Sequence, residues 1–135
     1  MLIQLLNSFH PAITPSNTKV HLAQHNGKVH PIDVYLEGGF DKWQSWQTRK
    51  NFECRYLIGL VEIPKTRKWL LAGVYDSLKV GRKIAVSDGH DYIYDYRRLP
   101  EFAELEGRLI IRYKKPRANY VYLKTCLPSM TVSSA

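Results

Sequence analysis

Two apolar runs in the middle of the chain give the clearest structural signal. Residues 56–63 (YLIGLVEI) and 69–75 (WLLAGVY) are rich in β-branched and aromatic side chains, and the basic segment 64–68 separates them. Runs of this length and composition are typical of buried strands, and a short polar segment that begins with proline is typical of a turn. The pattern therefore predicts two central antiparallel strands joined by a basic turn.

Weaker patterns on both sides of these runs predict further strands and short helices. Alternation of apolar and polar side chains indicates strands at residues 19–24, 108–114 and 120–124. Apolar residues at helical spacing indicate short helices at residues 1–9, 32–47 and 101–105. Gly38 and Gly39 should break the second of these, leaving a separate helix at 42–48, and Gly107 should end the third. We therefore expect an α+β fold, a small antiparallel, barrel-like β-sheet with two or three short helices.

Length and composition fit one domain. The chain has 135 residues, of which 44% are hydrophobic and 24% charged, as in ordinary globular proteins. We expect a single domain over residues 1–127, with the small and polar residues 128–135 as the start of a linker to a further module. Residues 1–6 lack the features of a signal peptide, and Cys54 and Cys126 lie in apolar surroundings. We therefore expect a cytoplasmic protein with two reduced cysteines.

The charge balance points to a polyanionic partner. Lys and Arg number 20 against 12 Asp and Glu, a net charge of +8, and aromatic residues make up 12% of the chain. A positive field combined with many aromatic rings is typical of proteins that bind nucleic acids. General solubility of a basic domain is the alternative explanation for the charge.

Two basic clusters account for much of this signal. Segment 108–124 has no acidic residue and contains the cations Arg108, Arg112, Lys114, Lys115, Arg117 and Lys124. Strand alternation should place the first three on one face, and Lys115 and Arg117 at a hairpin tip. The turn at 64–68 carries the second cluster, Lys65, Arg67 and Lys68, beside Trp69. Such cations can hold phosphates while aromatic rings stack on bases, although a solvated strand face would have the same composition.

No pattern in the chain indicates a catalytic or metal site. His21, His25 and His30 follow one another, but positions 21 and 25 of a strand lie about 13 Å apart, too far to share one ion directly. Asp88, His90, Asp91 and Asp95 are strung along a polar, Gly-containing segment and fit a solvated loop better than a metal site. We therefore assign no catalytic residue, metal ligand or cofactor to this chain.

Five segments in order carry a resemblance to a known family. They are VHLAQH (20–25), FDKWQSWQ (40–47), FECRYLIGLVEI (52–63), WLLAGVYDSL (69–78) and GRLIIRY (107–113). This order resembles the amino-terminal domain that precedes the catalytic module in restriction-type GIY-YIG endonucleases of bacteria and their phages. The resemblance implies a DNA-recognition domain, with modified bases as one kind of target. Cleavage, and a divalent metal such as Mg²⁺, would then belong to a nuclease module outside this segment.

Taken together, the sequence predicts a non-catalytic DNA-recognition domain of an endonuclease-like protein. Its expected nucleic-acid contacts are His25, Trp46, Arg55, Lys65, Arg67, Lys68, Trp69, Arg112, Lys114, Lys115 and Arg117. RNA stays open as an alternative nucleic acid. A protein-interaction or assembly domain that docks a nuclease or partner subunit is the second hypothesis, and it predicts a large exposed apolar patch. A free-standing enzyme on a phosphorylated substrate would need a clustered carboxylate or histidine pocket.

Overall fold

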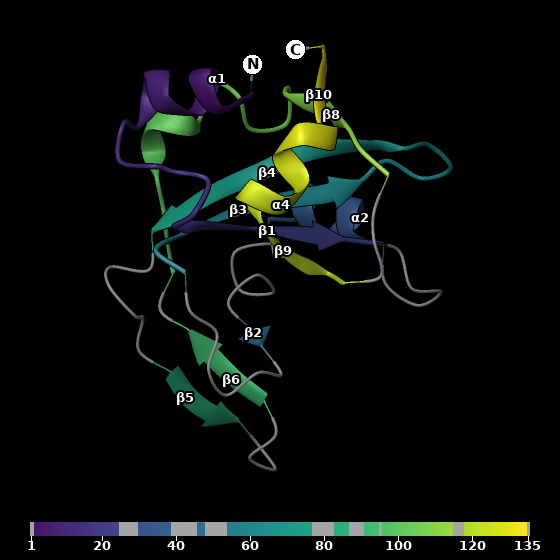
Figure 1. Cartoon of the computed structure of the whole chain (residues 1–135). Helices are drawn as coiled ribbons and strands as arrows, with labels where there is room; N and C mark the ends of the chain where they lie inside the picture. Colours follow the sequence, from purple (N-terminus) through teal and green to yellow (C-terminus); the bar gives the residue numbers. More distant parts are fainter. Residues whose placement is uncertain are drawn as a thin grey trace.

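The computed structural model (Figure 1) describes residues 2–24, 30–38, 46–47, 54–76, 83–86, 91–94, 96–114 and 118–134. At 46–47, 83–86, 91–94 and 134 only the backbone is described.

A long hairpin forms the centre of the structure. Strands β3 (Tyr56–Glu62) and β4 (Lys68–Asp76) pair antiparallel, as predicted from the two apolar runs. In the turn between them, the Thr66 hydroxyl donates to the Ile63 carbonyl oxygen at 2.7 Å, and the Ile63 amide donates to the Lys68 carbonyl oxygen at 3.0 Å. These bonds satisfy part of the turn's backbone polar groups locally.

The hairpin lies inside a larger sheet with the strand order β10-β8-β4-β3-β1-β9. The added strands are β1 (Thr18–Ala23), β8 (Ile110–Arg112), β9 (Tyr120–Tyr122) and β10 (Thr131–Ser134), and β7 (Arg97–Arg98) pairs with the end of β4. The sheet curls like half of a barrel (Figure 1), so the predicted α+β fold with a barrel-like sheet is confirmed.

One strand pair differs from the expected antiparallel arrangement. β1 and β3 run parallel, from Thr18 opposite Tyr56 to Ala23 opposite Val61. More than 30 residues connect these strands, enough for the crossover that a parallel pair requires. Apolar alternation indicates where a strand lies and not its direction, so the sequence pattern could not distinguish the two cases.

Short helices cover both faces of the sheet. α1 (Leu2–Phe9) and α4 (Leu123–Cys126) contribute Leu2, Leu6 and Leu123 to the main core cluster, whereas Ile32 and Tyr35 of α2 (Pro31–Leu36) pack against a second cluster. Two 3₁₀ turns, η1 (Pro100–Phe102) and η2 (Leu127–Ser129), complete the described helical segments. The predicted helix at 1–9 is confirmed, and Gly107 has the positive φ of 75° expected of a residue that ends a helical segment.

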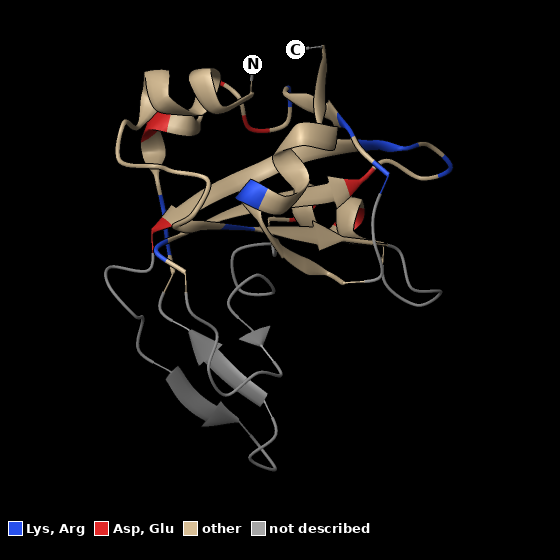
Figure 2. Cartoon of the chain, in the orientation of Figure 1, with Lys and Arg blue, Asp and Glu red and all other residues tan. Residues whose placement is uncertain are grey.

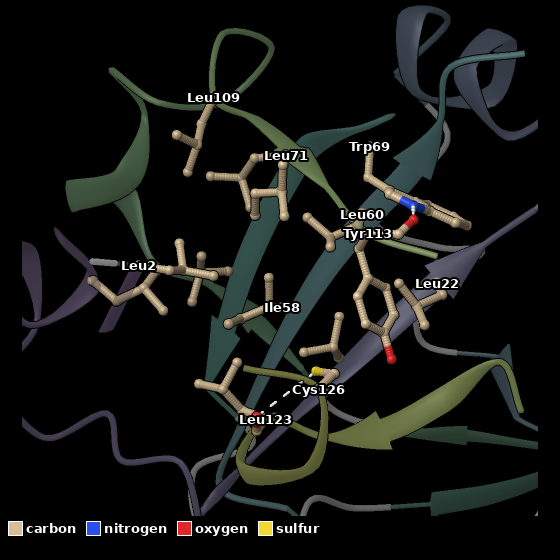
Figure 3. Packing of buried hydrophobic residues seen from close by; sticks show 14 of the residues in the cluster. Leu2, Leu22, Ile58, Leu60, Trp69, Leu71, Leu109, Tyr113, Leu123 and Cys126 are labelled. Carbon is tan, nitrogen blue, oxygen red and sulfur yellow. Dashed lines mark hydrogen bonds between the residues drawn. The ribbon is translucent and has the colours of Figure 1, made fainter. Parts of the chain in front are cut away.

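The two core clusters follow from alternation along the central strands. In β3, Tyr56, Ile58 and Leu60 belong to the main cluster, and Leu57 and Val61 belong to the second. A strand with both faces buried is apolar throughout, as this one is. Figure 3 shows the main cluster, in which Trp69 and Leu71 of β4 lie with Leu109 and Tyr113 from the β8 segment.

A smaller sheet contains β2 (Trp46–Gln47), β6 (Asp91–Tyr94) and β5 (Lys83–Val86) in that order. The helix predicted at 42–48 is therefore wrong at residues 46 and 47, which pair with Ile93 and Tyr92. Aromatic residues at helical spacing can also line a strand, and here pairing with β6 decided the outcome. The other residues of that predicted helix lie outside the described part of the chain.

The segment expected as a linker continues the fold. Residues 127–129 form η2, and β10 pairs antiparallel with β8, with Thr131 opposite Arg112 and Val132 opposite Ile111. Val132 packs against the main core. Small β-branched and hydroxyl residues suit a short edge strand as well as a linker, so composition alone could not separate the two.

Candidate nucleic-acid interface

The β3–β4 turn and the end of β8 lie side by side. Lys68 is directly opposite Arg112 in the β4–β8 register, and the Tyr113 amide donates to the Arg67 carbonyl oxygen at 2.9 Å. Lys114 follows Tyr113, and Lys65 lies in the same turn as Arg67. The two basic clusters of the sequence are thus joined into one cationic patch, consisting of Lys65, Arg67, Lys68, Arg112 and Lys114. Figure 2 shows their blue segments on one side of the molecule.

Alternation along residues 109–114, called the β8 segment because they contain β8, directs the cations outward. Leu109, Ile111 and Tyr113 are buried, whereas Arg112 and Lys114 are exposed. The buried residues anchor the strand in the main core and leave the charged side chains free to meet a ligand. The predicted alternation therefore holds from Leu109 to Lys114, whereas Arg108 is exposed but lies in the turn before β8.

A hollow of about 260 Å³ opens within the patch. Its lining residues are Arg67, Arg112, Tyr113, Lys114, Ser129 and Thr131. They come from the β3–β4 turn, the β8 segment, η2 and the start of β10. The hollow thus combines three cations with two exposed hydroxyl groups, a donor set suited to phosphate oxygens.

The patch has no carboxylate partner among the residues described. The ion pairs found there are His10–Glu101, Arg55–Asp76 and Arg98–Glu106, and none includes a member of the patch. No described ion pair therefore neutralises a member of the patch.

The turn also holds a backbone outlier. Lys65 has φ = 61°, in the left-handed region. A residue with a Cβ atom costs about 1–2 kcal/mol there, and glycine or asparagine is the usual occupant. The chain instead carries an exposed lysine at this position.

Arg55 does not belong to the patch. It precedes β3, and the seven residues of that strand place it about 23 Å from the turn. Its Nε and Nη2 donate to Asp76 at 2.8 and 3.3 Å, which raises the pKa of Arg55. Arg55 thus forms a tertiary ion pair that ties the open ends of β3 and β4 together, and the nucleic-acid contact expected there stays a prediction.

Trp69 cannot take the base-stacking role that the sequence predicted for it. Its side chain is only 3% exposed, and its Nε1 donates to the Tyr113 carbonyl oxygen at 2.9 Å (Figure 3). A base cannot stack on a buried ring, so Trp69 supports the patch from beneath. Its place at the start of an apolar strand was the signal for burial.

The remaining predicted contacts cannot be placed in the interface. His25, Lys115 and Arg117 lie outside the described residues, and for Trp46 only the strand backbone is described. Their expected roles stay predictions.

A hydrogen-bonded chain that the sequence analysis missed lies at the opposite end of the hairpin. His10 Nδ1 is 2.7 Å from Glu101 Oε2, and His10 Nε2 is 3.1 Å from the Tyr56 hydroxyl. The amide of Glu101 and then His10 lower the pKa of the Glu101 carboxyl. Because both ring nitrogens of His10 are engaged and Tyr56 is buried, this chain fastens the end of α1 and η1 to β3. Only tertiary structure brings residues 10, 56 and 101 together.

The histidines and cysteines show no metal centre in the described part of the chain, where no three His, Cys, Asp or Glu side chains gather. His21 is buried and stacks on Tyr120, with ring centroids 4.3 Å apart. Cys54 and Cys126 are both reduced, as expected, and burial raises the pKa of each thiol, that of Cys126 to about 11. No described helix has the length and apolar character needed to cross a membrane.

Comparisons with known proteins give no relative: no family model matches the chain, and no curated protein or solved structure is significantly similar to it. The resemblance to the amino-terminal domain of GIY-YIG endonucleases therefore stays a prediction.

Proposed function

We propose that this chain is a non-catalytic, cytoplasmic DNA-recognition domain that holds the duplex backbone with the cationic patch. The observation that carries the proposal is the Lys68–Arg112 pair, two like charges directly opposite on neighbouring strands, neither of which forms an ion pair with a described carboxylate. Facing like charges destabilise a free sheet. A polyanion bound over them removes this repulsion and releases its own counterions.

The backbone of the turn supports the same proposal. Strained, non-glycine residues in exposed turns concentrate at functional sites, because selection keeps the side chain despite its conformational energy. Lys65 in the left-handed region is such a residue. A lysine at the tip of the hairpin adds a cation to the patch that contains Lys68 and Arg112 and provides a further phosphate contact.

DNA is the preferred polyanion for two reasons. Duplex DNA presents one negative charge per about 1.7 Å of helix axis, a density that a row of cations across adjacent strands can engage at several phosphates. The likeness to the front domain of GIY-YIG endonucleases favours DNA over RNA, and it assigns cleavage and its divalent metal to another module. Phosphate contacts position a protein without reading sequence, so recognition of a base, modified or not, would need further residues.

The second hypothesis, a docking domain for a nuclease or partner subunit, has less support. Among the described residues, the large apolar side chains that are exposed are Leu36 and Tyr122, on α2 and β9. Two side chains on separate elements fall short of the contiguous patch of several hundred Å² that marks a docking surface.

The test is duplex binding by matched charge variants. Fluorescence anisotropy with a labelled duplex compares wild type with Lys68→Gln, Arg112→Gln and the double variant. Each lost contact to a phosphate should weaken binding about tenfold. Arg97→Gln serves as the control because Arg97 is an exposed arginine opposite Asp76, at the far end of β4 from the turn.

Equal losses for Arg97→Gln and Arg112→Gln would contradict the proposal, because they would indicate a dependence on net charge and not on the patch. A single-stranded RNA and a duplex RNA of the same sequence serve as competitors. Stronger binding of either RNA than of duplex DNA would overturn the choice of DNA.

A further inference from the structure

The hollow inside the cationic patch concentrates more charge than the grip on a duplex backbone requires. Its walls come from four segments: Arg67 in the turn, the β8 segment with Arg112 and Lys114, Ser129 of η2 and Thr131 of β10. The hollow is open to solvent, and residues of all four segments line one space, so their donors can reach a single phosphate group.

The charge of the lining favours a terminal phosphate over an internal backbone phosphate. A phosphodiester has a single negative charge and two free oxygens, whereas a terminal phosphate monoester carries about −1.5 to −2 at neutral pH and has three acceptor oxygens. Three cations line the hollow. Two of them are arginines, whose planar guanidinium groups can bind two oxygens of one phosphate at once.

Hydroxyl groups complete the donor set. Thr131 lies directly opposite Arg112 in the β8–β10 register, and Ser129 precedes the same strand. Both residues are exposed, so their hydroxyl groups are available to a ligand. They supply neutral donors beside the cations, which a surface selected for solubility alone would not need.

We propose that this hollow binds a terminal phosphate monoester, and that the chain thereby recognises the phosphorylated end of a nucleic-acid strand. This inference rests on the proposed function and refines it, because the same patch would hold the adjoining backbone through Lys65 and Lys68. The ligand class is the phosphate monoester, which a strand end and a free nucleotide share.

The experiment compares three duplexes of one sequence that carry a 5′-phosphate, a 3′-phosphate or hydroxyl groups only. Wild-type protein should bind one of the phosphorylated duplexes about tenfold more tightly than the hydroxyl duplex at the same salt concentration. Arg112→Gln should abolish this preference. The double variant Ser129→Ala, Thr131→Val should reduce it, whereas Arg97→Gln, at the far end of β4, should leave it unchanged. Circular dichroism of each variant verifies the fold.

Competition separates the two sources of the monoester. A free nucleoside monophosphate that displaces the phosphorylated duplex no better than inorganic phosphate supports recognition of the strand end. Displacement at micromolar nucleotide concentration would overturn it in favour of a nucleotide site.

The two proposals fail in different ways. Equal affinity for all three duplexes, with steep salt dependence retained, overturns the end-recognition inference and leaves the proposed function standing. Absence of salt-dependent binding to any duplex overturns the proposed function itself.

Discussion

Removing one charge from the Lys68–Arg112 pair should stabilise the free protein. Directly opposite side chains have Cβ atoms about 5 Å apart, and their charged ends lie roughly 7 Å apart when fully extended and splayed. At that distance two unit charges in a water-like dielectric repel by about 0.6 kcal/mol. Lys68→Gln and Arg112→Gln should each raise the unfolding free energy by roughly this amount at low salt, and the double variant should gain little more than either one.

Urea unfolding at low and at high salt measures the effect. In 1 M salt the Debye length is about 3 Å, so the repulsion and the gain from either substitution should nearly vanish. Arg97→Gln is again the control, since Arg97 is not opposite a second cation. Single variants that are destabilised at low salt, or gains that add fully in the double variant, would show that the two charges do not repel each other.

Three further predictions concern residues around the patch. Lys65→Gly should raise the unfolding free energy, because relief of about 1–2 kcal/mol of left-handed strain exceeds the roughly 0.5–1 kcal/mol entropic penalty of glycine. The variant should also bind duplex DNA more weakly, because it lacks a cation. A lower stability in urea unfolding would contradict the first expectation. Trp69→Phe leaves the Tyr113 carbonyl oxygen without its donor and should lower the unfolding free energy by about 1–3 kcal/mol. The folded variant should bind DNA as wild type does. Weaker binding by the folded variant would mean that Trp69 contacts DNA. Because burial raises the pKa of Cys126 from 9.0 to about 11, the thiolate forms more readily in the unfolded chain, so stability should be complete below pH 9 and should fall by about 2–3 kcal/mol between pH 9 and 11. Cys126→Ala should lack this part of the pH dependence in parallel urea titrations, and identical pH profiles would refute it.

The sequence predicted the parts of the fold that depend on local pattern. The β3–β4 hairpin followed from two apolar runs around a basic turn, and the outward cations of β8 followed from alternation. The parallel β1–β3 pair and the edge strand β10 were missed, because strand direction and sheet neighbours depend on tertiary contacts.

The candidate site was predictable in the same limited sense. Both basic clusters could be found from composition, but their union requires the β4–β8 register, which places Lys68 opposite Arg112. The ion pair of Arg55 could not be foreseen, because Asp76, its partner, is 21 residues away. Trp69 was misassigned because an aromatic side chain suits both a stacking platform and a core, and here its apolar strand decided for the core.

The most direct test of the cationic patch is the slope of log K against log salt for duplex DNA. Five cations at the interface predict a slope of up to about −4.5, and Arg112→Gln should make it shallower by about 0.9. A slope near zero, or one that Arg112→Gln leaves unchanged, would contradict the claim that the patch holds the phosphate backbone.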